Sequence, residues 1–137
     1  MIAVDTSALM AILLQEPGWD DLVRAVETAE GLCISAGTLA EAMIVAERRS
    51  IAAEMAQLIE GLGIEVVALG GSGALAVAAA YRAWGKGVHP AGLNFGDCFA
   101  YALASERSCP LLFVGEDFRQ TDLRAATGQD QPAARAR

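Results

Sequence analysis

The sequence is poor in the residues that many enzymes use as nucleophiles, bases and soft metal ligands. Its 137 residues contain one histidine, His89, and three cysteines, Cys33, Cys98 and Cys109, without C-x-x-C spacing. A single histidine disfavours most zinc sites and Ser-His-Asp triads, and we expect the thiols to be reduced and packed in the core. Aromatic residues make up only 6% of the chain, so we expect a core of Ala, Leu, Val and Ile.

Long apolar runs and an excess of basic residues are also lacking. No apolar run approaches the roughly 20 residues that are needed to cross a bilayer, so we expect no membrane segment. The N-terminal stretch has no basic leader and carries Asp5 in its apolar part, which predicts a cytoplasmic protein without a signal peptide. The net charge of −7 disfavours a polyanionic partner when taken alone, but a bound cation can reverse the charge locally.

Three stretches of the chain lack charge except for one carboxylate in each. They are residues 1–15, 31–46 and 87–105, and their lone acids are Asp5, Glu41 and Asp97. At the chain average of 20%, these stretches would carry about ten charges. A buried carboxylate is costly unless it is paired or bound to a cation, and no equally isolated Lys or Arg is present. We therefore expect the acids to meet around a hard divalent cation, Mg²⁺ or Mn²⁺.

Short apolar segments alternate with helical patterns along the chain. We expect strands at 1–5, 31–34, 64–68 and 111–114, with room for a fifth near 122–126, and helices at about 7–15, 19–29, 36–48, 50–61, 72–84 and 95–106. The expected helix caps are Thr6 or Ser7, Ser35 and Ser50. This alternation predicts an α/β protein with a central parallel sheet of four to five strands, covered on both faces. We expect one domain over residues 1–126 and a disordered polar tail over 127–137.

Four acids are placed where such a sheet binds its ligands. In open α/β sheets the site lies beyond the carboxyl ends of the strands. Asp5 closes the first strand, Asp97 lies in the first turn of one helix and Glu41 in the second turn of another, and Asp117 follows the last strand. Simpler interpretations remain open, because Asp5 could only cap a helix, Asp97 could only complement a helix dipole, and Asp117 could be an ordinary turn residue. Glu116 competes with Asp117 for the fourth position.

Four carboxylates around one or two such ions would favour hydrolysis of a phosphodiester, because the ions activate water and stabilise phosphoryl charge. No G-x-x-x-x-G-K-[ST] loop is present, which disfavours an NTPase. The alternative is a Mg²⁺-binding Asp pocket that serves signalling or protein binding without nuclease activity. A receiver-like module would need paired acids after the first strand and a Lys near residue 114, and a D-x-D phosphatase would need an acid at Ser7.

Four ordered segments resemble the PIN-domain ribonucleases, in particular the VapC toxins of type II toxin–antitoxin pairs. The segments are DTSAL, ISAGTLAEAMIV, GKGVHPAGLNFGDCFAYALA and LLFVGEDFRQTDL, and the resemblance spans about residues 1–126. It implies a PIN-like three-layer sandwich and a metal-dependent endoribonuclease toxin, with RNA as substrate, a VapB-like antitoxin as partner, and a homodimer. The family's acids correspond to Asp5, Glu41, Asp97 and Asp117 of this chain.

Other polar residues are expected around these acids. The resemblance includes a hydroxyl residue after the first Asp, and both Thr6 and Ser7 fit that position as groups that orient Asp5. Asn94 is expected to support the site in the same way. Four basic residues lie close to the acidic segments in sequence and could contact RNA phosphates: Arg82, Lys86, His89 and Arg119. The alternative for each is a solvated surface position.

Overall fold

Four short parallel strands lie at the centre of the molecule, in a computed structural model that describes residues 1–127. The strands are β1 (Ile2–Val4), β2 (Leu32–Ser35), β3 (Glu65–Val67) and β4 (Leu111–Leu112), in the order β3-β2-β1-β4. Ala3 of β1 pairs with Cys33 on one side and with Leu111 on the other. From β1 the chain adds β2 and β3 on one side of the sheet and then returns to add β4 on the other side. The position between β1 and β4 is therefore the switch point at which α/β sheets bind ligands.

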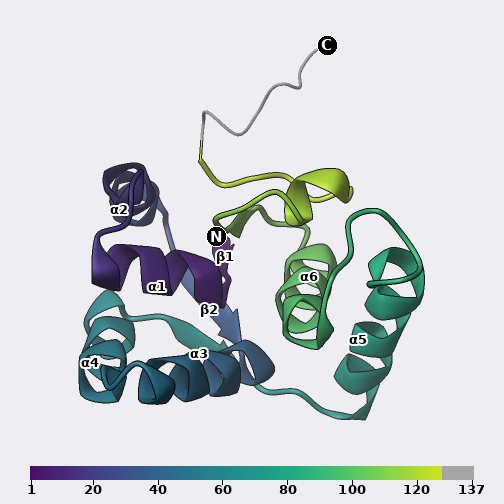
Figure 1. The fold of residues 1–137 in the computed structure, drawn as a ribbon, viewed down its shortest axis with the longest axis horizontal. Helices are drawn as coiled ribbons and strands as arrows, with labels where there is room; N and C mark the ends of the chain where they lie inside the picture. Colours follow the sequence, from purple (N-terminus) through teal and green to yellow (C-terminus); the bar gives the residue numbers. More distant parts are fainter. Residues whose placement is uncertain (128–137) are drawn as a thin grey trace.

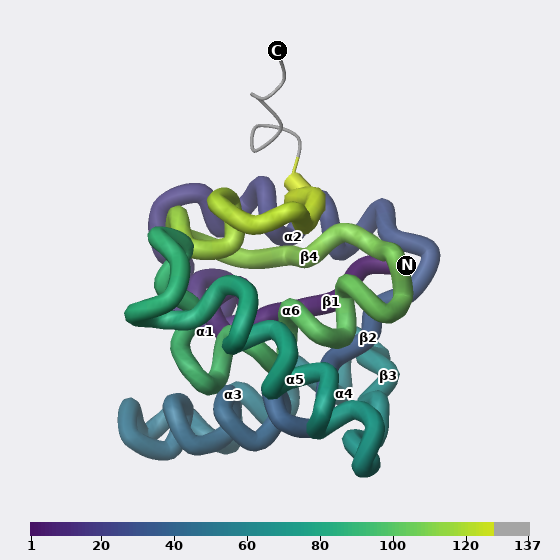
Figure 2. The backbone as a smooth tube through the Cα atoms, turned by 90° about the vertical axis from the view of Figure 1, so that its right-hand side faces the viewer, coloured from purple at the N-terminus to yellow at the C-terminus, as the bar shows by residue number. Residues whose placement is uncertain are grey.

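Helices cover both faces of the sheet. They are α1 (Thr6–Leu14), α2 (Trp19–Thr28), α3 (Ala36–Arg48), α4 (Ala52–Leu62), α5 (Gly71–Trp84) and α6 (Phe95–Arg107), and a 3₁₀ turn, η1 (Phe118–Gln120), follows β4. Figure 1 shows α1 to α4 on one side of the strands and α5 and α6 on the other. Figure 2 shows the molecule turned by 90°, with α5 nearest to the viewer and the strands behind it. The predicted α/β three-layer architecture is confirmed, with four strands in the described part of the chain.

The two core clusters follow the period of two that strands impose on their side chains. One cluster lies under α5 and α6 and contains Ala3, Cys33 and Leu111, and the other lies under α1 to α4 and contains Val4, Ile34 and Leu112. The three cysteines are buried and free, as expected. Strands that are buried on both faces explain why these segments read as continuous apolar runs.

Two of the expected helix caps are wrong. Asp5, and neither Thr6 nor Ser7, caps α1, because the helix begins one residue earlier than expected. Ser50 adopts a left-handed conformation with φ of 61°, and its N–H donates to the carbonyl of Glu47, so it ends α3 and does not begin α4. Ser35 caps α3 as expected, with its hydroxyl accepting a hydrogen bond from Gly37 N.

The C-terminal expectations have different outcomes. The fifth strand is wrong, because residues 122–126 form only an isolated bridge between Ala125 and Leu111. The domain boundary at 126 stays a prediction, and the expected tail lies, from Gly128 onward, outside the described residues. None of the helices within residues 1–127 is long and apolar enough to cross a membrane.

Candidate active site

Asp5 lies at the carboxyl end of β1 and is only 3% exposed. Its Oδ2 accepts hydrogen bonds from Ser7 N (3.0 Å) and Ser7 Oγ (2.6 Å), and Ser7 Oγ accepts one from Val114 N (3.0 Å) just after β4. Ser7 thus holds Asp5 in place and links it to the neighbouring strand. Asp5 Oδ1 is buried without a hydrogen-bond partner. A buried carboxylate oxygen without a donor is costly, and a cation is a partner that would satisfy it.

Glu41 reaches the same edge of the sheet from the second turn of α3. Its Oε1 accepts a hydrogen bond of 2.7 Å from Thr6 Oγ1, and the Thr6 hydroxyl also lies 3.4 Å from the carbonyl of Thr38. The expectation that Thr6 orients Asp5 is therefore corrected. Successive residues at a helix start point in different directions, so Ser7 turns back to Asp5 while Thr6 points across to α3.

Asp97 lies in the first turn of α6 and forms a capping box with Asn94. Asp97 N donates to Asn94 Oδ1 (2.9 Å), and Asn94 N donates to Asp97 Oδ2 (3.0 Å). This arrangement satisfies two backbone donors at the helix start and fixes the Asp97 side chain. Asn94 is thus the partner that orients Asp97, as expected, and the capping interpretation of Asp97 is also correct.

The acids share one electrostatic environment. Burial raises the pKa of Asp5 from 3.8 to about 6, with the Ser7 hydrogen bonds opposing and the charges of Asp97 and Glu41 adding to the effect. Burial also raises the pKa of Asp97 to about 6, aided by the charges of Glu41 and Asp117. The charges of Asp97 and Glu41 thus act on Asp5, and those of Glu41 and Asp117 act on Asp97, while a single site made of all four acids stays a prediction.

Asp117 and Glu116, the two candidates for the fourth acid, have different surroundings. Asp117 is exposed at the start of η1, and its charge contributes to the raised pKa of Asp97. Glu116 instead forms an ion pair with Arg119, with 3.4 Å between Oε2 and Nε. Which of the two is the fourth acid of the site stays a prediction.

The donor set suits a hard divalent cation, although no cage is preformed. Within residues 1–127, no three Asp, Glu, His or Cys side chains already stand close enough to hold an ion. Glu41 and Asp97 each use one oxygen for a neighbour, Thr6 and Asn94 respectively, while Asp5 Oδ1 has no partner. Without a cation the carboxylates repel one another. Small side-chain rotations would convert this metal-free arrangement into one in which the carboxylates surround an ion. The residues therefore fit an oxygen-coordinated metal centred on Asp5.

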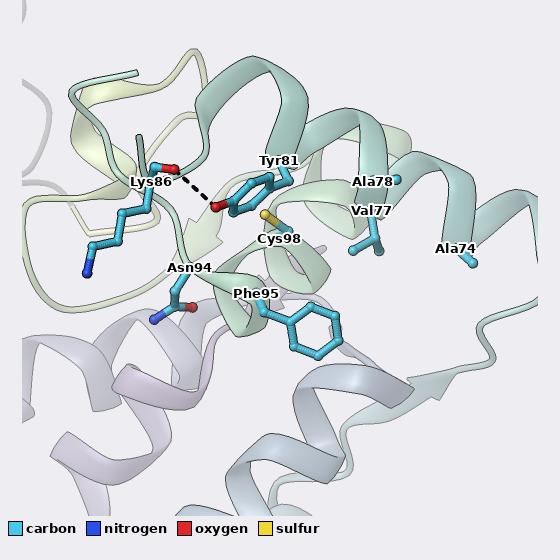
Figure 3. Close-up of a pocket in the computed structure, with 8 residues that line it drawn as sticks. All are labelled: Ala74, Val77, Ala78, Tyr81, Lys86, Asn94, Phe95 and Cys98. Carbon is cyan, nitrogen blue, oxygen red and sulfur yellow. Dashed lines mark hydrogen bonds between the residues drawn. The ribbon is translucent and has the colours of Figure 1, made fainter. Parts of the chain in front are cut away.

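An apolar groove opens beside the first turn of α6, between α5 and α6. Its volume is about 540 Å³, and its lining residues include Val77, Tyr81, Phe95 and Cys98. Figure 3 shows the Lys86 ammonium and the Asn94 amide at the same end of this groove, and Tyr81 donates a hydrogen bond to the Lys86 carbonyl (3.0 Å). Lys86 is thus the basic residue that the structure places beside the acidic helix start.

The other three basic residues have different surroundings. His89 Nδ1 accepts a hydrogen bond from Ala91 N (3.0 Å), and its ring lies edge-on to Trp84 with centroids 4.7 Å apart. These contacts shape the loop between α5 and α6, and none of those described for His89 reaches an acid of the site. Arg119 pairs with Glu116, and Arg82 is exposed in the last turn of α5. Their contacts with RNA stay predictions.

Comparisons with known proteins agree with this geometry. The PIN domain family profile matches residues 2–123. Among solved structures, VapC20 of Mycobacterium tuberculosis, a sarcin-ricin loop cleaving toxin, has a TM-score of 0.76 at 16% identity and covers 93% of this chain and 100% of its own. VapBC2 from Rickettsia felis, bound to a DNA fragment from their promoter, has a TM-score of 0.67 at 15% identity, covering 91% and 97%. The class that the fold and the site define is that of the PIN domains.

Sequence relatives narrow this class. Ribonuclease VapC30 of Mycobacterium tuberculosis is 41% identical over 125 residues, which cover 89% of this chain and 95% of the relative. Ribonuclease VapC of Mycolicibacterium smegmatis is 42% identical over 127 residues, covering 90% and 98%. The chain belongs to the PIN-domain family and is one of its VapC-type ribonucleases. Nucleases of this family are in general dependent on divalent metal ions.

One residue next to these acids was not singled out from the sequence, Gly96. It directly precedes Asp97 in α6, and its backbone lies against the Glu41 carboxylate. The available signal was a glycine inside a helix, where it is unfavourable unless something needs the space.

Proposed function

We propose that this chain is the toxin of a type II toxin–antitoxin pair, and that it hydrolyses RNA with Asp5, Glu41, Asp97 and Asp117 as the acids that hold Mg²⁺ or Mn²⁺. The observation that supports the assignment is the buried Asp5 oxygen without a partner at the carboxyl end of β1, where the charges of Asp97 and Glu41 add to the raised pKa of Asp5. A bound ion of this kind supplies an activated water and stabilises charge on the phosphoryl group.

The surrounding residues prepare the acids for this task. Ser7 holds Asp5 with two hydrogen bonds, Thr6 holds Glu41 with one, and Asn94 holds Asp97 through the capping box. Groups that fix the orientation of metal-binding side chains typically contribute about 10- to 100-fold in metal affinity or activity. Lys86, at the end of the groove next to α6, is placed to contact a phosphate of the RNA.

The test is cleavage of a fluorescent RNA pool with Mg²⁺, Mn²⁺ or EDTA. Wild type should cleave only with metal, and folded Asp5→Asn and Asp97→Asn should not cleave. Glu60→Gln, at an exposed position of α4, is the control for loss of one surface charge and should cleave normally. Near wild-type cleavage by either Asn variant in Mg²⁺ would refute the site. Metal binding by wild type without RNA cleavage would favour the Asp-pocket signalling or protein-binding module.

We also propose a VapB-like antitoxin as partner, with a basic segment that places an Arg among the acids. The support is the acidic site itself, together with fold neighbours that include a toxin–antitoxin complex from Klebsiella pneumoniae. A guanidinium can satisfy two carboxylate oxygens at once and would compete with the metal. Binding of the antitoxin should therefore weaken as Mg²⁺ is raised, and binding that ignores both Mg²⁺ and Asp5→Asn would place the antitoxin elsewhere.

A homodimer is proposed on the apolar surface near the groove. Leu75 of α5 and Phe95 of α6 are each 73% exposed, which is unusual for such large apolar side chains. Sedimentation should show a dimer at micromolar concentration, and Leu75→Lys/Phe95→Lys should give the 14.2 kDa monomer. A cytoplasmic location is supported by the RNA substrate and by the three free thiols.

A further inference from the structure

Gly96 lies where α6 passes closest to the Glu41 carboxylate. A Cβ atom built on Gly96 would overlap Glu41 Oε2 and would lie only 2.6 Å from the carboxyl carbon. Real Cβ atoms essentially never come within 3.0 Å of such atoms, so every residue other than glycine would displace Glu41 from its present place. The carboxylate thus lies directly on the backbone of the first turn of α6.

The other oxygen of the Glu41 carboxylate is held by a hydrogen bond. Thr6 donates a 2.7 Å hydrogen bond to Oε1 from the start of α1. The carboxylate thus lies between the Thr6 hydroxyl and the Gly96 backbone, and Asp97 is the next residue of α6. The influence of Glu41 on the pKa of Asp97 agrees with this proximity.

Gly37, on the facing helix α3, makes a close contact of a different kind from that between Gly96 and Glu41. Gly37 of α3 receives the Phe99 ring of α6, and a Cβ there would lie 2.6 Å from a ring carbon. The ring of Phe99 packs against Phe95 and the core, so it has little freedom to withdraw. Glu41, in contrast, presents the far end of a flexible side chain to Gly96. A methyl group at Gly96 would therefore move a carboxylate and leave the helix packing intact.

We propose that Gly96 is a positioning residue that sets the place of Glu41 in the metal site, an inference that rests on the proposed function of the four acids. Gly96 itself contacts neither metal nor RNA. It acts by leaving the volume that Glu41 needs in order to lie beside Asp97.

The test is a double-mutant cycle read out as Mn²⁺ affinity, measured from the EPR signal of free Mn²⁺ in the absence of RNA. Gly96→Ala should weaken Mn²⁺ binding about 10- to 100-fold. Glu41→Asp shortens the acid by one methylene and withdraws it from α6. In the Glu41→Asp background, Gly96→Ala should change the Mn²⁺ affinity little further, because the shorter acid no longer occupies the space beside residue 96.

Stability measurements separate positioning from packing. Metal-free Gly96→Ala should melt no lower than wild type, because alanine favours the helix more than glycine does. Gly61→Ala is the matched control, since Gly61 lies in α4 with nothing within 4 Å of the added atom, and it should keep wild-type Mn²⁺ affinity. Gly37→Ala should melt lower, because the Phe99 ring must shift.

The outcomes are distinguishable. Three results would each overturn the role of Gly96 alone: wild-type Mn²⁺ affinity in Gly96→Ala, an equal loss of affinity with and without Glu41→Asp, or a fall in melting temperature like that of Gly37→Ala. If wild type bound no Mn²⁺, or if Asp5→Asn bound it equally well, the proposed function of the acids would fail, and the Gly96 proposal with it.

Discussion

Replacing Asp5 with Asn should stabilise the metal-free protein at neutral pH. The pKa of Asp5 is raised from 3.8 to about 6, mainly by burial, so the charged form is disfavoured in the folded state. At about 1.4 kcal/mol per pH unit, this difference corresponds to about 3 kcal/mol of free energy of unfolding. The Asn amide N–H₂ would take the place of the partnerless Oδ1, and a buried amide without an acceptor costs about 1–3 kcal/mol. We therefore expect a net gain of up to about 2 kcal/mol.

The change with pH of the stability difference between Asp5→Asn and wild type tests this reasoning better than the difference at one pH. A raised pKa means that the folded protein keeps the Asp5 proton to higher pH than the unfolded chain does. The stability that this protonation provides is complete below pH 3.8 and is lost as pH rises to about 6. The Asn variant carries no such proton. Its stability relative to wild type should thus increase by about 3 kcal/mol between pH 3.5 and pH 7.

The assay is urea unfolding followed by circular dichroism in EDTA, at several pH values from 3.5 to 7.5. Glu60→Gln serves as the surface control and should stay within about 0.5 kcal/mol of wild type. Adding Mg²⁺ at neutral pH should reverse the order, because an ion that binds only the folded wild type stabilises it by about 2.7 kcal/mol at 100 times its Kd. A stability difference between Asp5→Asn and wild type that did not change with pH would refute the electrostatic reasoning.

Three further predictions concern the surroundings of the acids. Thr6→Val should fold normally but weaken Mn²⁺ binding about 10-fold or more, because Glu41 loses its donor; unchanged affinity in an Mn²⁺ titration would contradict this. Asp117→Asn should slow single-turnover RNA cleavage about tenfold or more while Glu116→Gln does not, and the reverse result would make Glu116 the fourth acid. Lys86→Ala should reduce the slope of log affinity against log salt for single-stranded RNA by about 0.7, and an unchanged slope would remove Lys86 from the interface.

The sequence predicted the architecture because it depends on local patterns, and the same patterns single out the four acids, whose shared metal site stays a prediction. Continuous apolar strands alternating with helices define a parallel sheet, and isolated acids such as Glu41 stand out against apolar helices. The capping and metal-site interpretations of Asp5 and Asp97 looked like alternatives in the sequence. In the structure both acids cap their helices, and this does not exclude the metal-site interpretation, because the first turn of a helix at the carboxyl edge of a sheet can serve both purposes.

Side-chain contacts between different helices and strands could not be predicted from the sequence. Thr6 and Ser7 are adjacent, yet Thr6 contacts Glu41 and Ser7 contacts Asp5, and only the crossing of α1 over α3 decides which is which. A glycine inside a helix marks Gly96 as unusual, but the group that lies against it is a carboxylate 55 residues earlier in the chain, which the sequence does not reveal. Ser50 was misassigned because a serine between two helices can equally end one or begin the next.

The pairing of β1 with β4 has a consequence for biosynthesis. Asp5 N donates to the Leu112 carbonyl, and Ser7, which holds Asp5, is bonded to a residue 107 positions later. A growing chain on the ribosome therefore has no β4 neighbour for β1, and no complete support for Asp5, until residues 111–114 have been translated. Such long-range pairing forms late. An RNA-cleaving chain with this topology would therefore gain the complete surroundings of Asp5 only after β4 has been synthesised.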